Sequence, residues 1–407
     1  MLTLAIPFRN LLRHRTRTVM AISAIGFGVI ALLLADGFIQ WIFWAMREST
    51  IQSRLGHIQV VSPGYHQSGL ADPFAYLLPA ESEDKKNLEN LPGVSLLAPR
   101  LSFSGLLSYG DNSISFIGEG VDVKKERELS RHLHITEGSD LQESESAGVL
   151  LGIGLARNLG VKPGDTVVLL VTTGAGGINA MELNVRGLFY TSTKAYDDTA
   201  LRVPHDIANQ LLRVTGTHRW IVLLEETDST DVIKAALEER FPVKEAGLEF
   251  VAWHELSDFY NKTVALFSRQ MRVLWIMIAT IIVMTISNTL IRGMLERIGE
   301  IGTLLALGDK RAGILKMFLG EGLLLGLGGG MAGVIAGVSL AKIISAIGIP
   351  MPPPPGMSQG FTGEILVTGP LIAGAMLMAV GTSVVASLYP AWKASRLVIV
   401  DALRHNR

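Results

Sequence analysis

The sequence contains no cysteine, which excludes disulfide bonds, a lipid-bearing cysteine and thiolate metal sites. Charge is scarce as well: charged residues make up 18% of the chain, whereas hydrophobic residues make up 48%. That balance is typical of a membrane protein rather than of a string of soluble domains. The formal net charge is only −1, so nothing indicates a nucleic-acid partner.

Motifs of catalysis are missing too. The chain has no G-x-S-x-G, no H-E-x-x-H and no G-x-x-x-x-G-K-[ST] motif. It therefore has no P-loop for ATP, and any energy must come from another subunit or from a gradient. His132 and His134 could clamp a metal on a strand, but no third ligand is indicated. We expect no catalytic residue, no metal site and no cofactor bound by this chain.

By contrast, four segments are long and apolar enough to cross a bilayer, whose ~30 Å hydrocarbon core takes about 20 helical residues. We predict transmembrane helices within residues 19–46, 263–292 (together with a stalk), 314–347 and 367–390. The first segment follows several arginines, as a cleaved signal sequence would. Its apolar part is too long for a signal and no small-x-small cleavage site follows it, so we expect it to be retained.

Basic residues at the helix ends predict the orientation. They gather in the N-terminal segment (1–18), between the second and third spans (293–313) and in the C-terminal tail (391–407), whereas the proline-rich loop 348–366 has none. We therefore expect an inner-membrane protein with both termini in the cytoplasm and the loop outside it. Residues 47–262 are then a periplasmic domain with a stalk.

Asp36 is an acidic residue inside the first apparent membrane segment. An acid at that depth is a functional candidate. Alternatively, Trp41 and Trp44 mark an aromatic belt near the outer boundary, which would leave Asp36 close to lipid headgroups. The sequence leaves both interpretations open.

The large insert has the pattern of an α+β domain. Its strand candidates are β-branched or alternating and are bounded by Gly, Pro, Asn and Asp clusters, and "VKPGDT" (161–166) predicts a tight turn. We predict strands at residues 57–62, 102–109, 113–121, 166–173, 182–190 and 220–226, and helices at residues 153–159, 206–213 and 230–240.

Helical spacing of apolar residues continues upstream of the second span, through Leu256, Phe259, Val264 and Phe267. One interpretation is a surface helix followed by a separate membrane helix. The other is a single helix over residues 254–291, about 57 Å long, which would act as a rigid stalk.

The third span contains glycines at small-xxx-small spacing, which lets helices approach closely in lipid. They pack either against the fourth span of the same chain or against a second copy. One register holds Gly322, Gly326 and Gly330, and the other holds Gly329, Gly333 and Gly337.

Residues 296–311, "ERIGEIGTLLALGDKR", lie between the second and third spans. Two glycines would each cost a helix up to ~1 kcal/mol, and Glu296 and Glu300 stack as like charges. A mere connection has no need of such features, whereas small residues beside acids and an arginine suit docking against another protein. Gly308 ends this element and Asp309 can cap the next helix. The alternative is a plain membrane-surface helix.

Several of these stretches resemble the FtsX/MacB-type ABC transporter permeases. The resemblance is closest to the lipoprotein-releasing (Lol-type) branch. It is carried by "FRNLLRHRTRT" (8–18), "MLERIGEIGTLLALGDKRAGILKMFLGEG" (294–322) and "YPAWKASRLVIVDALR" (389–404), and in the insert by residues 56–65, 152–170 and 185–212.

The resemblance implies a fold of four transmembrane helices with a large α+β extracytoplasmic domain inserted between helices 1 and 2. It implies two copies of a partner ABC ATPase, which would hold ATP and Mg²⁺, and a second permease, identical or homologous. The cytoplasmic coupling helix (293–313) would dock on the ATPase and drive external movements, a mode called mechanotransmission. The docking residues carried over are Glu296, Arg297, Glu300, Gly302 and Gly308.

The cargo implied is a lipoprotein or another hydrophobic molecule released from the membrane. In the Lol-type subunit that recruits a periplasmic carrier a longer hairpin projects, whereas the matching stretch here (171–184) is short and Gly-rich. Alternatives are tripartite efflux of a drug or peptide through an adaptor, FtsX-like activation of a cell-wall hydrolase without transport, and a peptide-sensing accessory of a histidine kinase.

Overall fold

The computed structural model describes most of the chain. The described residues are 5–69, 71–130, 133–142, 147–191, 193–352 and 360–397. His132, residues 353–359 of the predicted proline-rich loop and residues 398–407 of the predicted tail lie outside them.

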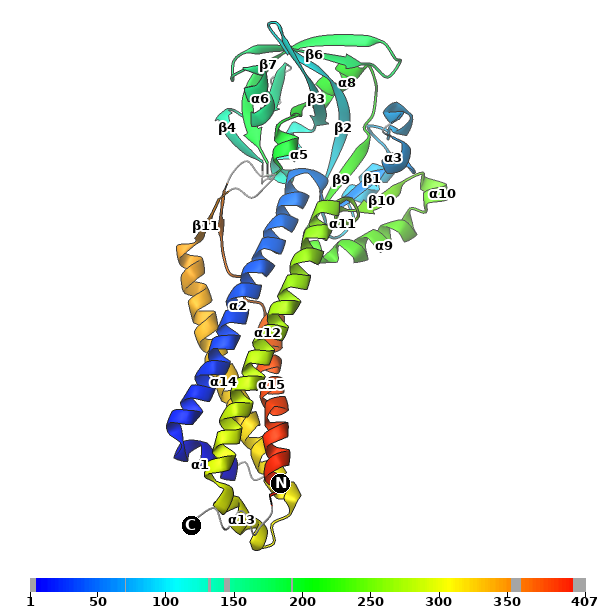
Figure 1. The fold of residues 1–407 in the computed structure, drawn as a ribbon. Helices are drawn as coiled ribbons and strands as arrows, with labels where there is room; N and C mark the ends of the chain where they lie inside the picture. The colour runs from blue at the N-terminus through cyan, green and yellow to red at the C-terminus, as the bar shows by residue number, and fades with distance from the viewer. Residues whose placement is uncertain are drawn as a thin grey trace. The chain divides into compact units, whose positions relative to one another are not determined.

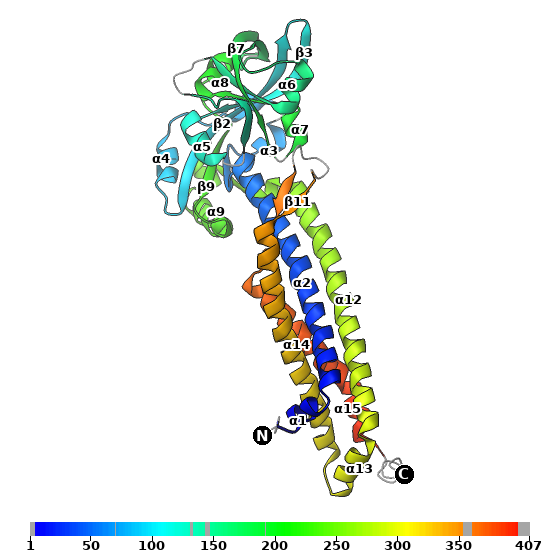
Figure 2. The same ribbon diagram turned by 90° about the vertical axis from the view of Figure 1, so that its left-hand side faces the viewer.

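The chain divides into two compact units. One consists of Met1–Trp44, Thr263–Pro350 and Thr362–Arg407. The other consists of Ala45–Lys262 and Met351–Phe361. We call them the helical unit and the sheet unit, after the elements that dominate each (Figures 1 and 2).

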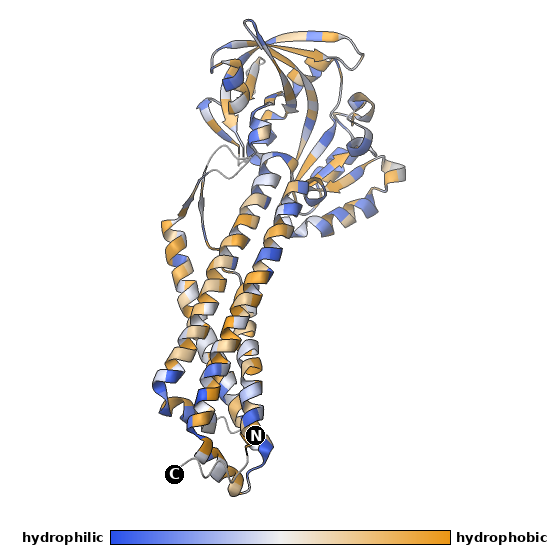
Figure 3. Ribbon diagram, in the orientation of Figure 1, coloured by the Kyte–Doolittle hydropathy of each residue, from blue (hydrophilic) through white to orange (hydrophobic). Residues whose placement is uncertain are grey.

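Four helices of the described residues are long and apolar enough to cross a membrane. They are α2 (Arg15–Thr50), α12 (Asp258–Glu296), α14 (Arg311–Ile347) and α15 (Gly369–Ser395). Figure 3 shows hydrophobic residues along each of them. The prediction of four apolar spans is confirmed, and each helix runs a few residues beyond at least one of its predicted ends.

The helix upstream of the second span is continuous with it. α12 runs without a break over 39 residues, about 58 Å at helical rise. It begins at Asp258 rather than at residue 254, because Ser257 leaves helical geometry and closes the short α11 (Trp253–Leu256). Of the two interpretations left open by the sequence, the single long helix is the one observed.

Glycines bring α14 close to two neighbouring helices. A Cβ at Gly326 would come within 3.0 Å of the Val380 Cα on α15, and one at Gly333 within 2.9 Å of the Gly26 Cα on α2. Such contacts exclude larger side chains. Gly322, Gly326 and Gly330 face α15, whereas Gly329, Gly333 and Gly337 face α2. The second register thus packs on the first span rather than on the fourth.

A ten-stranded sheet forms the sheet unit, in the order β10-β1-β9-β2-β3-β8-β5-β7-β4, with β6 pairing both β2 and β7. Most neighbours are antiparallel, but β3 pairs with β8 and β5 with β7 in parallel. The strands are β1 (Ile58–Val61), β2 (Val94–Tyr109), β3 (Asn112–Val121), β4 (His134–Gly138), β5 (Gly148–Gly152), β6 (Thr166–Thr172), β7 (Ile178–Tyr190), β8 (Ala200–Pro204), β9 (Arg219–Leu224) and β10 (Glu249–Ala252). A separate two-stranded sheet pairs β11 (Ile349–Met351) with β12 (Phe361–Gly363).

Short helices complete both units. In the sheet unit, α6 and α8 cover one apolar cluster of the sheet, and α4 and α9 cover another. These elements are α1 (Ala5–Arg13), α3 (Tyr65–Ser68), α4 (Glu83–Glu89), α5 (Val123–Leu129), α6 (Ile153–Leu159), α7 (Lys194–Asp197), α8 (His205–Leu212), α9 (Thr230–Arg240), α10 (Val243–Ala246), the π-turn η1 (Ile51–Leu55), and the 3-10 turns η2 (Pro73–Tyr76) and η3 (Thr227–Ser229).

All six predicted strands are present, as β1, β2, β3, β6, β7 and β9, and the three predicted helices are α6, α8 and α9. β2 starts at Val94, before its predicted start, because its first half pairs with β9 and its second half with β3. The predicted turn holds Gly164 at a φ of 99°, a value that favours glycine. The shorter strands β4, β5, β8 and β10 escaped prediction.

Candidate functional site

A short helix, α13 (Ile298–Ala306), separates the apolar helices α12 and α14. Arg297 interrupts the helical run, with φ −114° and ψ 18°, and Gly308 beyond α13 has a φ of 96°. The predicted short element and its glycine terminator are therefore both present. The cap is corrected: Lys310 rather than Asp309 occupies the N-cap of α14, because its backbone is still extended at φ −71° and ψ 144°.

α13 has one buried side and one exposed side. Ile301 and Gly302 are buried, and Ile301 belongs to the same apolar cluster as Ile314 and Phe318 of α14. Leu307, directly after α13, is 81% exposed, the highest value of any large hydrophobic residue in the described part of the chain. The junction is therefore anchored through its apolar side and presents an unpacked leucine at its end.

Arginines from the beginning of the chain pair with the acids of this junction. Arg13 Nη1 lies 2.9 Å from Glu300 Oε1, and Arg17 pairs with Glu296. Arg297 Nε donates to Glu300 Oε2 at 3.2 Å. Burial opposes the charge of Glu300, but the hydrogen bonds and positive charges of Arg297 and Arg13 outweigh it, so the pKa of this carboxyl lies below its ordinary value.

One more carboxylate joins this network. Glu321 on α14 accepts a hydrogen bond from Arg297 Nη1 at 3.0 Å and another from Asn10 Nδ2 on α1 at 2.8 Å. The side chain of Arg297 is only 11% exposed and points inward, unlike that of a residue that contacts a partner. Asn10 and Glu321 were not predicted as site residues, because no local pattern in the sequence connects positions more than 300 residues apart.

Five charged side chains form a second cluster, buried in the sheet unit. Glu119 on β3 accepts from Arg100 Nη1 at 2.9 Å and from Arg219 Nη2 at 2.6 Å. Glu126 Oε1 on α5 accepts from Arg100 Nη2 and Arg202 Nη1, both at 2.6 Å. Burial would raise the pKa of both carboxyls, but the arginines outweigh it and lower each pKa below its ordinary value.

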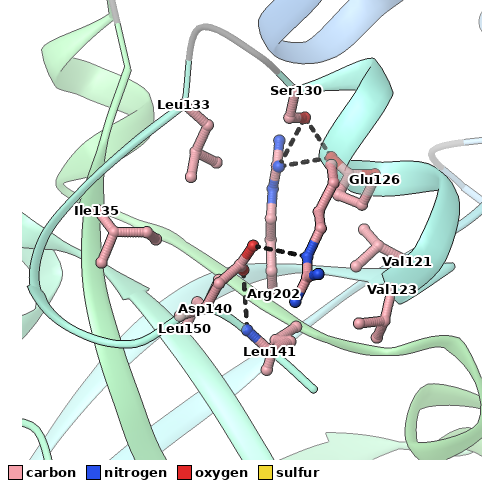
Figure 4. Close-up of a pocket in the computed structure, with 11 residues that line it drawn as sticks. Val121, Val123, Glu126, Ser130, Leu133, Ile135, Asp140, Leu141, Leu150 and Arg202 are labelled. Atoms are coloured by element: carbon pink, nitrogen blue, oxygen red, sulfur yellow. Dashed lines mark hydrogen bonds and ion pairs between the residues drawn. The ribbon is translucent and has the colours of Figure 1, made fainter. Parts of the chain in front are cut away.

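A cavity of about 210 Å³ lies beside this charge cluster (Figure 4). Glu126, Ser130 and Arg202 line it and bond to one another, with Arg202 Nη1 donating to Ser130 Oγ at 3.0 Å. Because these groups already pair among themselves, the cluster resembles a structural brace more than a catalytic site. The rest of the wall is largely aliphatic: Val121, Val123, Leu133, Ile135, Leu141 and Leu150.

Two residues singled out in the sequence have simpler surroundings. Asp36 accepts a hydrogen bond from the indole Nε1 of Trp275 at 3.1 Å. His134 is exposed on β4, with its ring centroid 5.1 Å from that of Tyr190. Within the described ranges, no group of three or more His, Cys, Asp or Glu side chains could hold a metal ion.

Comparisons with protein families match both units. The model of the MacB-like periplasmic core domain matches residues 18–240, more than half of the 407 residues. The model of the FtsX-like permease C-terminal region matches residues 272–399, which contain the second part of α12, all of α13 and all of α14.

Individual relatives match over most of the chain. An uncharacterized ABC transporter permease of Methanocaldococcus jannaschii is 25% identical, over 98% of this chain and 96% of that protein. The lipoprotein-releasing system transmembrane protein LolC of Xylella fastidiosa is 27% identical, over 77% of this chain and 79% of its own length. The macrolide export ATP-binding/permease protein MacB of Sodalis glossinidius is 25% identical, over 96% of this chain but 58% of that protein.

Proposed function

Because the chain belongs to the FtsX/MacB/LolC family of ABC transporter permeases, we propose that it is a membrane subunit that a separate ATPase drives through α13. Two copies of that ATPase bind and hydrolyse ATP with Mg²⁺, and a second permease, identical or homologous, completes the transporter. The chain itself contains no P-loop motif, in agreement with this division of labour.

The exposed leucine at the end of α13 carries the proposal. Leu307 lies outside the four apolar helices, at the end of a charged junction, and is 81% exposed. An apolar side chain beside charged residues fits a protein partner. We propose that Leu307, Gly308 and the exposed acids Glu296 and Glu300 contact the ATPase. Arg297 and Gly302, whose positions are turned inward, shape the junction instead.

The orientation follows the basic residues at the helix ends. We propose that the N-terminal segment (1–18), the junction (293–313) and the tail (391–407) are cytoplasmic. The sheet unit then lies in the periplasm, and ATP-driven movement of the helices changes its conformation there. The unbroken α12 supports this mode, because a continuous helix transmits displacement along its axis.

For the cargo, we propose a lipoprotein or another hydrophobic molecule released from the membrane. The similarity to LolC, named as part of a lipoprotein-releasing system, supports this class. The turn between β6 and β7 spans only residues 173–177, so we assign no carrier-binding hairpin to this chain. The similarity to MacB over 96% of the chain favours efflux as the second candidate function.

The docking proposal is tested by assembly of the chain with its candidate ATPase in lipid nanodiscs. Leu307→Glu places a charge in the proposed contact, and Glu300→Lys reverses an exposed one; both should release the ATPase and lower its ATP turnover. The matched control is Ile178→Glu, because Ile178 is 75% exposed in the sheet unit. If Leu307→Glu retains the ATPase as well as the control does, α13 is not the docking element.

A further inference from the structure

A buried carboxylate lies behind α13. Glu321 is 5% exposed, and an ionised group at such a place needs strong partners. Its Oε1 accepts from Arg297 Nη1 at 3.0 Å and from Asn10 Nδ2 at 2.8 Å. The two donors come from different elements, since Asn10 belongs to α1 and Arg297 to the break between α12 and α13. One oxygen atom of α14 thus ties together segments that are distant in the sequence.

Arg297 is shared between two acids. Its Nη1 binds the buried Glu321, and its Nε binds Glu300 of α13 at 3.2 Å. The side chain of Arg297 is 11% exposed and that of Glu321 is 6% exposed, whereas that of Glu300 is 48% exposed. The arginine therefore connects an acid that a partner can reach with an acid that it cannot reach.

Apolar packing also holds α13 against α14. Ile301 of α13 is fully buried in one cluster with Ile314 and Phe318 of α14. A small cavity of about 30 Å³ adjoins the polar side and is lined by Arg297 and Glu321, among others. Two contacts of different chemistry thus oppose rotation of α13 about the break at Arg297.

We infer that Arg297 and Glu321 form a latch that fixes α13 against α14 and α1. They are positioning residues: neither is accessible to the ATPase, yet together they make a displacement of α13 move α14 instead of bending the break. Without the latch, the ATPase still binds, but the displacement of α13 bends the chain at Arg297 and does not move α14. The coupling role rests on the docking function proposed above, whereas the fixed position of α13 does not.

The absence of cysteine allows a direct test. In the full chain in nanodiscs, Leu307→Cys and Met331→Cys carry spin labels at two exposed positions, and their distance distribution reports the placement of α13 on α14. A second labelled pair, Met331→Cys with Tyr389→Cys, reports α14 against α15. Glu321→Ala removes both hydrogen bonds, Glu321→Gln keeps an acceptor, and Arg13→Gln removes only a surface pair.

The expected result is loss of the single narrow Leu307–Met331 distance in Glu321→Ala and partial retention in Glu321→Gln. Arg13→Gln should leave it unchanged, and the α14–α15 distance should stay narrow in every variant. An unchanged distribution in Glu321→Ala overturns the latch. Broadening of both label pairs overturns it too, because the residue would then support the whole helical unit.

The ATPase partner supplies the coupling measurement. Because Leu307 belongs to the proposed contact, Ala306→Cys, at an exposed position of α13, carries the label in this measurement. On adding the ATPase with ATP and vanadate, the unsubstituted latch should keep the α13–α14 distance narrow and unchanged, whereas Glu321→Ala should retain the ATPase but give a shifted or broadened distance. A distance in Glu321→Ala that is as narrow and unchanged as with the unsubstituted latch overturns the coupling role. If the wild-type junction does not bind the ATPase, the proposed docking function is wrong. The distances measured without the ATPase still show whether the latch exists.

Discussion

Two groups of ion pairs in this chain use the same chemistry in opposite surroundings. Arg13 and Glu300 have side chains that are 69% and 48% exposed, whereas Arg100 and Glu119 are 0% and 4% exposed. Water screens the first pair and permits its acid to exchange one partner for another. Burial keeps the second pair from such screening, so removing one member leaves a buried charge with one partner fewer. Burial, rather than pairing, decides which group can serve a changing contact.

The largest expected effect is on the buried cluster. Glu119→Ala removes the carboxylate of Arg219 and one of the two carboxylates of Arg100. The loss of this buried acid should lower the free energy of unfolding of the sheet unit by about 3–5 kcal/mol. The loss of stability is measured by heating the full chain in detergent and monitoring the unfolding of the sheet unit by its proteolysis. Lys262→Ala is the control, because that side chain is 77% exposed. Equal stability of the two variants would contradict the idea that burial makes this cluster more important for stability than the exposed pairs.

The next effect is a dependence on pH. Burial, helped by Arg47 at His57 and by Arg219 at His218, lowers the pKa of both histidines from 6.5 to about 4. In the unfolded chain they take up protons already below pH ~6.5, so the sheet unit should lose stability as the pH falls from there towards 4. His218 alone should account for about 1–3 kcal/mol of that loss. His218 Nδ1 accepts from the Ser102 backbone N–H at 3.1 Å.

His218→Asn keeps an acceptor near that N–H but does not titrate. It should flatten the decline of the unfolding midpoint between pH 6.5 and 4. His134→Asn changes an exposed histidine and should leave the slope as it is. A wild-type slope in His218→Asn would show that His218 does not contribute to the pH dependence.

A smaller effect contrasts two glycines. A Cβ at Gly333 would lie 2.9 Å from the Gly26 Cα, whereas one at Gly381 on α15 would meet nothing within 4 Å. Gly333→Ala should therefore destabilise the helical unit by about 1–3 kcal/mol, and Gly381→Ala should be neutral or slightly stabilising. Unfolding midpoints in detergent compare the two. Shifts of the same sign and size would mean that the helices re-space freely.

The smallest effect is expected at the exposed pair. Arg13→Gln removes the 2.9 Å contact with Glu300, but surface pairs contribute about 0–1 kcal/mol, and Arg297 still neutralises the acid. The unfolding midpoint should stay within error of wild type at both low and high salt. A drop comparable to that of Glu119→Ala would mean that exposure does not separate the two groups.

Local patterns were sufficient for the long elements. Apolar length marked the four spans, and β-branched or alternating residues with turn signals marked β6 and β7. β8 escaped because its central residue is Arg202, a side chain that only a buried acid makes acceptable in a central strand. The acids concerned, Glu119 and Glu126, lie on other elements.

The sequence by itself determined the membrane class, the spans, the absence of a P-loop in the chain and the short junction between α12 and α14. Each of these depends on neighbouring residues, through hydropathy, helical period or a motif. Only the tertiary structure decided that Arg297 points inward to Glu321, that one glycine register packs on α2, and that three arginines share two buried acids. Those facts depend on contacts between distant parts of the chain, where burial sets the strength of each charge, and no local pattern encodes burial of that kind.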